Sequence, residues 1–237
     1  MTSELVKWRD ALIAAIEERQ IQPVFQPVWT IDGTLMGFEA LTRFPNGSPP
    51  DRVWALAEDQ GLVEQLDAVA LTAAVQDAQT LPGKLFLNIG ALYLAWIMQW
   101  EHGTDPARII WEVTETDPLT PDGAATVGRL KNRGYAFALD DAGTGYATPH
   151  QLYALQPQVV KLSLNMVHQW HRGHVQPLQL WIRAAHAMGA TVVAEGMEDR
   201  AWLSTLAAEG VDAIQGYAMG KPQPAASWQD ASRMFKK

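Results

Sequence analysis

Seven successive apolar runs in the sequence each finish with a polar side chain that can bind a proton, a metal ion or a substrate group. These residues are Glu39, Asn88, Glu112, Asp140 with its neighbour Asp141, Lys161, Glu195 and Gln215. Any one of them alone would be typical of a solvated loop residue or of a partner of a helix N-cap. Together they indicate one shared site, because the carboxyl ends of parallel strands in a barrel surround a single opening.

This group of side chains carries a large excess of negative charge. Glu115 and Glu198 follow closely after two of its members and bring the number of acids to seven. The nearby cations are Lys161 and Arg43, so seven minus two leaves five negative charges. Such a cluster must take up protons or bind cations. Carboxylate oxygens and one Asn amide, without Cys or His, suit Mg²⁺ or Mn²⁺. Two such ions are typical of phosphate-ester hydrolysis, in which one ion generates hydroxide and both hold phosphoryl oxygens.

Apolar strands that alternate with helices position these side chains. We expect strands near residues 24–29, 36–44, 84–89, 109–113, 136–140, 158–162, 191–195 and 213–217. We expect helices near residues 3–18, 51–59 and 63–79, and a helical segment after each later strand, including a long one that ends near Met188. The first two strands flank residues 30–35, which are too few for a crossover helix, and Asp32-Gly33 suits a tight turn between antiparallel strands. The pattern therefore predicts an α/β fold, a TIM-like (β/α)8 barrel with an antiparallel first strand.

Length and composition agree with one such barrel and exclude several other classes. The 237 residues suffice for a single domain over 1–237, in which residues 1–20 form an N-terminal helix that packs on the barrel. The net charge of −8 argues against binding of duplex nucleic acid, and the absence of Cys excludes disulfides and thiolate zinc sites. No apolar stretch is long enough to span a membrane, and the amino terminus lacks the apolar core of a signal peptide. We therefore expect a cytoplasmic protein.

Two further patterns indicate structure rather than chemistry. His168, His171 and His174 are spaced unlike any standard metal site, which favours a polar helix end or loop over a transition-metal site. Trp8, Trp54, Trp181 and Trp202 sit within helical patterns and are interpreted as packing residues.

Several short motifs in order give the chain a resemblance to a known family. GFEALTRF (37–44), FLN (86–88), WEVTET (111–116), LDDAGTGYA (139–147), VVK (159–161), VVAEGME (192–198) and IQGYAMGKP (214–222) lie along nearly the whole chain. In these motifs the sequence resembles the EAL-domain cyclic-di-GMP phosphodiesterases. The family fold is a β/α barrel with a reversed first strand, and the implied reaction is attack of a metal-activated water on one phosphodiester of cyclic di-GMP, which gives linear pGpG.

The resemblance also implies metal ligands and catalytic residues. Glu39, Asn88, Glu112 and Asp140 would hold a first metal ion, and Asp140, Asp141 and Glu195 a second. Lys161 would orient the metal-bound water or hydroxide. Glu195 lies where the family places a candidate general base, so Glu39, Lys161 and Glu195 are the expected catalytic residues. The implied cofactor is Mg²⁺ or Mn²⁺, as two ions.

Other residues would act on the substrate or around the metal ligands. By resemblance, Gln26 and Arg43 would contact the substrate, Arg43 through a phosphate, and Gln215 would lie beside them near the second metal ion. Glu115 would brace the loop 141–148, which in the family couples the metal site to dimerisation, and Glu198 would support the neighbouring loop. A homodimer and a sensory domain or partner protein are implied as well.

Three departures from the family pattern leave a second function open. Gly90, Ala142 and Ser163 stand where the family has Ser, Phe and Asp. Ser163 lacks a carboxylate two residues from Lys161, so Ser163→Asp is expected to raise turnover if that loss limits the rate. The alternative to an active phosphodiesterase is a catalytically weak or inactive receptor that binds cyclic di-GMP. Without the resemblance, another metal-assisted barrel hydrolase would also remain open.

Overall fold

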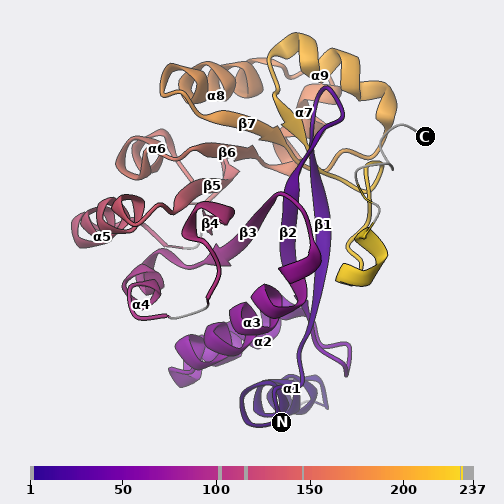
Figure 1. The fold of residues 1–237 in the computed structure, drawn as a ribbon. Coiled ribbons are helices and arrows are strands. Elements are labelled where there is room, and N and C mark those ends of the chain that lie inside the picture. The colour runs from indigo at the N-terminus through magenta and orange to yellow at the C-terminus, as the bar shows by residue number, and fades with distance from the viewer. Residues whose placement is uncertain (1–2, 101–102, 115–116, 146, 230, 232–237) are drawn as a thin grey trace.

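The computed structural model describes residues 3–100, 103–114, 117–145, 147–229 and 231. Eight strands close into one barrel in chain order (Figure 1). They are β1 (Gln22–Thr30), β2 (Leu35–Arg43), β3 (Lys84–Ile89), β4 (Ile109–Val113), β5 (Ala136–Ala142), β6 (Val159–Leu162), β7 (Thr191–Ala194) and β8 (Ala213–Ile214). The predicted (β/α)8 barrel is confirmed.

The reversed first strand is confirmed as well. β1 pairs antiparallel with β2 and with β8, whereas every other pair in the barrel is parallel. The turn between β1 and β2 closes through a 2.8 Å hydrogen bond from Thr30 N to Thr34 O, with Gly33 at φ 86°. β8 is shorter than the expected strand 213–217, although Gln215 N still donates to Ala194 O at 2.9 Å.

Helices surround the strands of the barrel (Figure 1). They are α1 (Ser3–Glu18), α2 (Pro50–Gln60), α3 (Val63–Asp77), α4 (Leu94–Ile97), α5 (Pro121–Asn132), α6 (Pro149–Leu155), α7 (Leu164–His171), α8 (Gln176–Ala187) and α9 (Leu203–Glu209). The expected long helix ending near Met188 is wrong, because the structure divides it into α7 and α8. Gly173 at φ 95° ends the first, and Pro177 occupies the first turn of the second, where its missing N–H costs no helical hydrogen bond.

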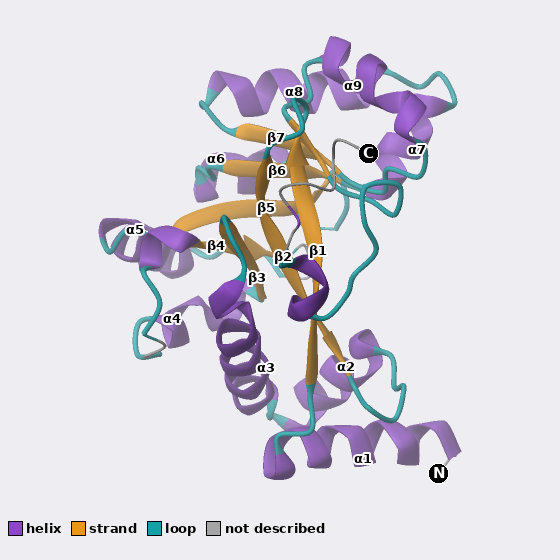
Figure 2. Ribbon diagram, turned by 45° about the vertical axis from the view of Figure 1, so that its right-hand side comes forward, coloured by secondary structure: helices purple, strands orange, loops and turns teal. Residues whose placement is uncertain are grey.

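Two separate apolar clusters support the region around the barrel mouth. The larger one lies between the strands and the surrounding helices, whereas a smaller one joins α1 to α2, the start of α3 and Phe44. Accordingly α1 lies beside α2 and α3, away from the strands (Figure 2). Within the described ranges, no helix combines the length and apolar character needed to cross a membrane.

Candidate active site

A layer of polar side chains sits directly above an apolar layer inside the barrel. The apolar layer consists of Val28, Phe86, Ile110, Ala138, Val159, Val193 and Ala213. Two residues further along β3 to β8 come Asn88, Glu112, Asp140, Lys161, Glu195 and Gln215. On the reversed strand β1 the order inverts, so Gln26 precedes Val28 and pairs with Glu39 of β2. Because strand side chains alternate between faces, the two-residue step directs each polar group into the same interior.

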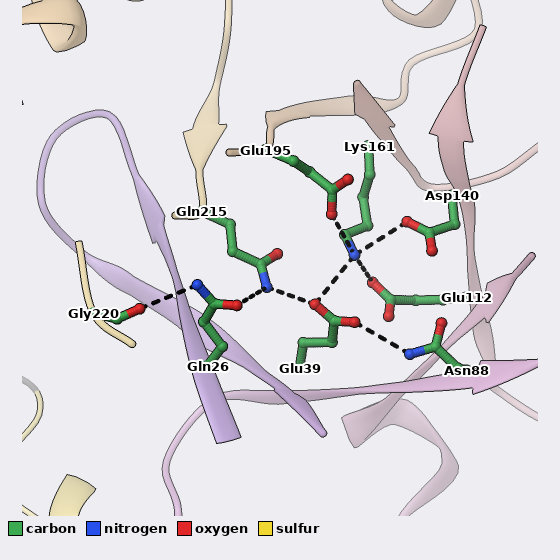
Figure 3. Close-up of polar contacts among 9 residues, drawn as sticks. All are labelled: Gln26, Glu39, Asn88, Glu112, Asp140, Lys161, Glu195, Gln215 and Gly220. Atoms are coloured by element: carbon green, nitrogen blue, oxygen red, sulfur yellow. Dashed lines mark hydrogen bonds and ion pairs between the residues drawn. The ribbon is translucent and has the colours of Figure 1, made fainter. Parts of the chain in front are cut away.

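Lys161 is the centre of this layer (Figure 3). Its Nζ lies 2.7 Å from Glu112 Oε1 and 2.7 Å from Glu195 Oε1. Asp140 Oδ1 is 3.1 Å away, and Glu39 Oε2 is 3.4 Å away. The lysine side chain is 1% exposed and that of Glu112 is 0% exposed. Four carboxylates thus share one buried ammonium, an arrangement called the carboxylate cage below.

Amide side chains hold Glu39 in the cage. Asn88 Nδ2 donates to Glu39 Oε1 at 3.1 Å, and Gln215 Nε2 donates to Glu39 Oε2 at 2.5 Å. Gln215 also reaches Gln26 Oε1 at 3.4 Å, and Gln26 Nε2 donates to Gly220 O at 3.1 Å. Both oxygens of Glu39 therefore accept hydrogen bonds from amide groups, which holds the carboxylate in one orientation (Figure 3).

Burial and neighbouring charges shift the pKa values of the cage residues in opposing directions. Burial raises the pKa of Glu112 well above its ordinary value and that of Glu195 to about 8, despite the attraction of Lys161. Burial alone would also raise the pKa of Glu39, but Lys161, Gln215 and Asn88 together bring it below its ordinary value. For Lys161, burial works against the charged form, yet the surrounding carboxylates raise its pKa well above normal. The lysine therefore keeps its charge while two of its acid neighbours favour protons.

The end of β5 interrupts the regular alternation of side chains. Its pairing with β6 shifts between Leu139 and Ala142, and Asp141 adopts a left-handed φ of 46°. This conformation is uncommon for a non-glycine residue and changes the direction of the chain at two consecutive acids. Ala142 is fully buried and pairs with Leu162, and Thr144 Oγ1 donates to Asp141 O at 2.7 Å, which fixes the start of the loop.

The chemistry of the cage fits a hard divalent cation. Four carboxylates against one ammonium leave a charge of −3 when all are ionised. Glu112 Oε2 is buried and lacks a hydrogen-bond partner among the described residues, as expected of an oxygen suited to a cation. Among the described residues, no three or more acidic or histidine side chains are already arranged to hold a metal ion, and Lys161 Nζ lies where the carboxylates converge. The donors are all oxygen, which favours Mg²⁺ or Mn²⁺ over softer metals.

A cavity of about 560 Å³ opens beside the cage. Asn88, which donates to Glu39 of the cage, also lines the cavity. Arg43 lies on the cavity wall, with its guanidinium donating to Thr42 O at 2.7 Å. α2 and α3 form the opposite side with Trp54 and Asp67. A cavity of this size accommodates a planar heterocycle next to the charged layer.

Trp54 and Asp67 are the residues that sequence reasoning missed. Trp54 packs against the cluster between α1 and α2, as the sequence predicts, and its Nε1 also donates to Asp67 Oδ1 at 2.8 Å. Burial raises the pKa of Asp67 to about 6 although this hydrogen bond opposes the shift. The available signal was an acid among the apolar residues Leu66, Ala70 and Leu71, which places a carboxylate on the buried face of a helix.

Glu198, Arg43 and Asp141 lie at an α7 contact, on the cavity wall and at the end of β5. Glu198 is exposed, and its Oε1 lies 3.7 Å from Nε2 of His168 on α7. Arg43 is exposed on the cavity wall, and Asp141 is half-buried at the end of β5. Glu115 lies outside the described residues.

Residues 9–222 match the family model of the EAL domain. The chain belongs to the EAL-domain family. Within the curated proteins it is 29% identical over 240 residues to the cyclic di-GMP phosphodiesterase PdeL of Escherichia coli K12, a match that covers 91% of this chain and 66% of PdeL. A second relative is the bifunctional diguanylate cyclase/cyclic di-GMP phosphodiesterase MucR of Pseudomonas aeruginosa, of which the match covers 34%. This EAL chain therefore spans between about a third and two thirds of these relatives.

Solved EAL structures share its fold. The PaMucR phosphodiesterase in complex with c-di-GMP superposes with a TM-score of 0.80 over 93% of this chain and 99% of that chain, at 24% identity. Klebsiella pneumoniae BlrP1, in a complex with manganese and cyclic di-GMP, gives 0.73 over 87% of this chain and 57% of that chain, at 28% identity.

Proposed function

We propose that this EAL chain is a metal-dependent phosphodiesterase that hydrolyses cyclic di-GMP to linear pGpG. The observation that carries the proposal is the carboxylate cage, because it gathers acids from four strands at the mouth of a barrel of this family. Relatives named as cyclic di-GMP phosphodiesterases, and a solved relative with manganese and cyclic di-GMP, support this choice of substrate and cofactor.

The metal ligands in this proposal are those of the cage and its edge. Glu39, Asn88, Glu112 and Asp140 would hold one Mg²⁺ or Mn²⁺, and Asp140, Asp141 and Glu195 would hold a second. Such ions polarise a phosphodiester and make water a stronger nucleophile at neutral pH. The burial of Glu112 and the donors on Glu39 keep these carboxylates in place, which lowers the reorganisation needed when a cation binds.

The chain's own residues supply proton transfer and orientation. Glu195, directly after β7 at the barrel mouth, is the proposed general base that would take the proton of the attacking water. Lys161 keeps its positive charge and contacts Glu195 at 2.7 Å, so it holds that carboxylate toward the centre of the barrel. Gln26 and Gln215 lie beside Glu39 and would contact the substrate, and Arg43 would pair with a phosphate oxygen.

The cavity between the cage and α2 is the proposed seat of one guanine base. A guanine presents adjacent N–H donors on its pairing edge, and the buried carboxylate of Asp67 can accept them. The indole of Trp54 beside this carboxylate offers an apolar surface of matching size. A base in this cavity would place the attached phosphate toward Arg43 and Asn88.

Dimerisation is a second part of the proposal. The loop 141–148 closes through a 2.9 Å hydrogen bond from Gly143 N to Ala147 O and leads into α6, where Tyr153 is 66% exposed. A homodimer formed through α6 would connect the loop that begins at Asp141 to a second copy. Sedimentation at several protein concentrations, with Tyr153→Ser as the variant, tests whether this face associates.

Turnover of cyclic di-GMP tests the enzymatic proposal. Wild-type protein is incubated with Mg²⁺ or Mn²⁺, with an EDTA control, and pGpG is separated by chromatography. Glu39→Ala is expected to abolish product by weakening metal binding, whereas Glu17→Ala on the exposed face of α1 serves as the matched control. Near-normal turnover by Glu39→Ala would contradict the metal-site assignment. Folded wild-type protein that binds cyclic di-GMP without product would instead identify a receptor.

A further inference from the structure

A tryptophan after β7 contacts two histidines of α7. The rings of His171 and Trp202 stack at 4.3 Å between centroids with an interplanar angle of 28°. His168, one helical turn earlier, meets the same indole edge-on at 6.0 Å and 89°. Residues three apart on a helix share one face, so α7 presents both rings to Trp202 at once.

The segment between Glu195 and Trp202 packs on α7 at two further points. Gly196 has a φ of 66°, and a Cβ there would lie 2.5 Å from Leu164 Cγ, so the backbone approaches the first residue of α7 closely. His168 Nε2 lies 3.7 Å from Glu198 Oε1, and this buried nitrogen has no hydrogen-bond partner among the described residues. The chain from 196 to 202 is therefore fastened to α7 along its length.

These contacts connect the two chain segments that carry Glu195 and Lys161, which form an ion pair in the carboxylate cage. Glu195 directly precedes the fastened segment, and Lys161 lies on β6, which continues through Ser163 into α7. Ser163 Oγ accepts a 3.3 Å hydrogen bond from Met166 N, so the start of α7 is capped close to Lys161. A displacement of residues 196–202 from α7 would therefore move Glu195 relative to its partner 2.7 Å away.

We propose that His168, His171 and Trp202 form an aromatic clasp that positions Glu195 in the carboxylate cage. The inference rests on the proposed function and assigns a role to the histidine cluster, which the cage itself does not use. All three are positioning residues, since none contacts the cage. The β8 side supplies the opposite support, because Met197 N donates to Gln215 O at 3.0 Å. The segment 196–202 is thus held on one side by α7 and on the other by the backbone hydrogen bond to Gln215.

Trp202→Ala tests the clasp directly. Loss of groups that orient a metal ligand commonly costs 10–100-fold in metal affinity or activity, so kcat is expected to fall by about tenfold or more. The KM for cyclic di-GMP should stay within about twofold, because the proposed base cavity lies on the α2 side. Calorimetry with Mn²⁺ and no substrate should show an affinity weakened by about tenfold. Trp202→Phe keeps a ring for stacking and should recover most of both quantities.

Two controls keep the inference testable. His174→Ala changes the third histidine of the cluster, which is exposed beyond the end of α7, and should leave kcat and Mn²⁺ affinity unchanged. If Trp202→Ala does not fold, His171→Ala removes the stacking partner from an exposed position and is compared with His171→Phe. A folded Trp202→Ala or His171→Ala with wild-type kcat and Mn²⁺ affinity overturns the clasp.

The two proposals fail in different ways. If wild-type protein makes no pGpG, the enzymatic proposal fails, but the ratio of Mn²⁺ affinities between wild type and Trp202→Ala still tests the clasp. If wild type is active and the clasp variants match it in both readouts, only the clasp fails.

Discussion

Neutralising Asp67 is expected to stabilise the protein at neutral pH. Burial raises the pKa of this carboxyl from 3.8 to about 6, a difference of roughly 2 units, and each unit corresponds to about 1.4 kcal/mol. Ionised Asp67 therefore costs about 3 kcal/mol above pH 6. Asp67→Asn removes this cost but leaves an amide N–H₂ without an assigned partner, which takes back about 1 kcal/mol. The net gain of about 2 kcal/mol corresponds to a rise of about 4–8 °C in Tm for a chain of this size.

The direction of the pH dependence follows from the same values. Between about pH 4 and pH 6 the folded protein holds more protons at Asp67 than the unfolded chain does. The stability contributed by the protonated form is therefore fully present below about pH 4 and is lost as the pH rises through about 6. The difference in Tm between Asp67→Asn and wild type should thus be small at pH 5 and large at pH 8.

Thermal denaturation in EDTA from pH 5 to pH 8 measures this effect. Asp59→Asn, on the exposed face of α2, is the matched control for removal of one surface charge. Parallel Tm curves for wild type and Asp67→Asn across this range would refute the reasoning. If Asp67 also accepts the donors of a guanine base, the stabilised variant should show a raised KM for cyclic di-GMP, a trade-off typical of functional acids.

Three further predictions concern the cage and its supports. Lys161→Met leaves the four carboxylates of the cage without their ammonium. It should lower the free energy of unfolding in EDTA by about 3–5 kcal/mol, with partial recovery in Mn²⁺. A wild-type Tm for this variant in EDTA would contradict the prediction. Leu12→Ala empties a site in the α1–α2 cluster and should cost about 2–5 kcal/mol. Leu12→Ala should also raise KM for cyclic di-GMP while kcat changes by no more than about twofold, because the cluster supports α2 beside the proposed base cavity. Steady-state kinetics in which only kcat fell would contradict this support. Ser163→Asp should keep the cap of α7 and raise turnover, whereas an unchanged rate would remove the missing carboxylate as a limit.

The barrel and its polar layer were predictable because strand geometry has a period of two. Once Phe86 and Ile110 are known to face the interior, Asn88 and Glu112 must face it as well, and their strands pair in that register. The apolar runs set the number of strands, and the short link between the first two set the reversed direction. These features depend on local sequence and on general rules of chain connection.

Other features depend on contacts between distant residues and leave little trace in a local pattern. Trp54 and Asp67 lie on different helices, and their hydrogen bond requires the angle between α2 and α3. The position of Lys161 at the centre of the cage depends on four other strands. The sequence indicated an excess of acids at the mouth, but it could not show that the ammonium occupies the point where the carboxylates converge.

The carboxylate cage is destabilising for the fold, and its presence despite that cost supports a functional role. Buried ionic groups are often less stabilising than apolar residues of similar volume, because desolvation of each ion costs several kcal/mol. The layer directly beneath shows that this barrel closes well with valine, alanine and phenylalanine. Lys161 offsets only one of the four charges, and burial raises the pKa values of Glu112 and Glu195 despite the attraction of Lys161, with repulsion from neighbouring carboxylates adding to the shift. A cation that displaces those protons would relieve the repulsion, so the same burial that weakens the empty cage strengthens its preference for a divalent ion.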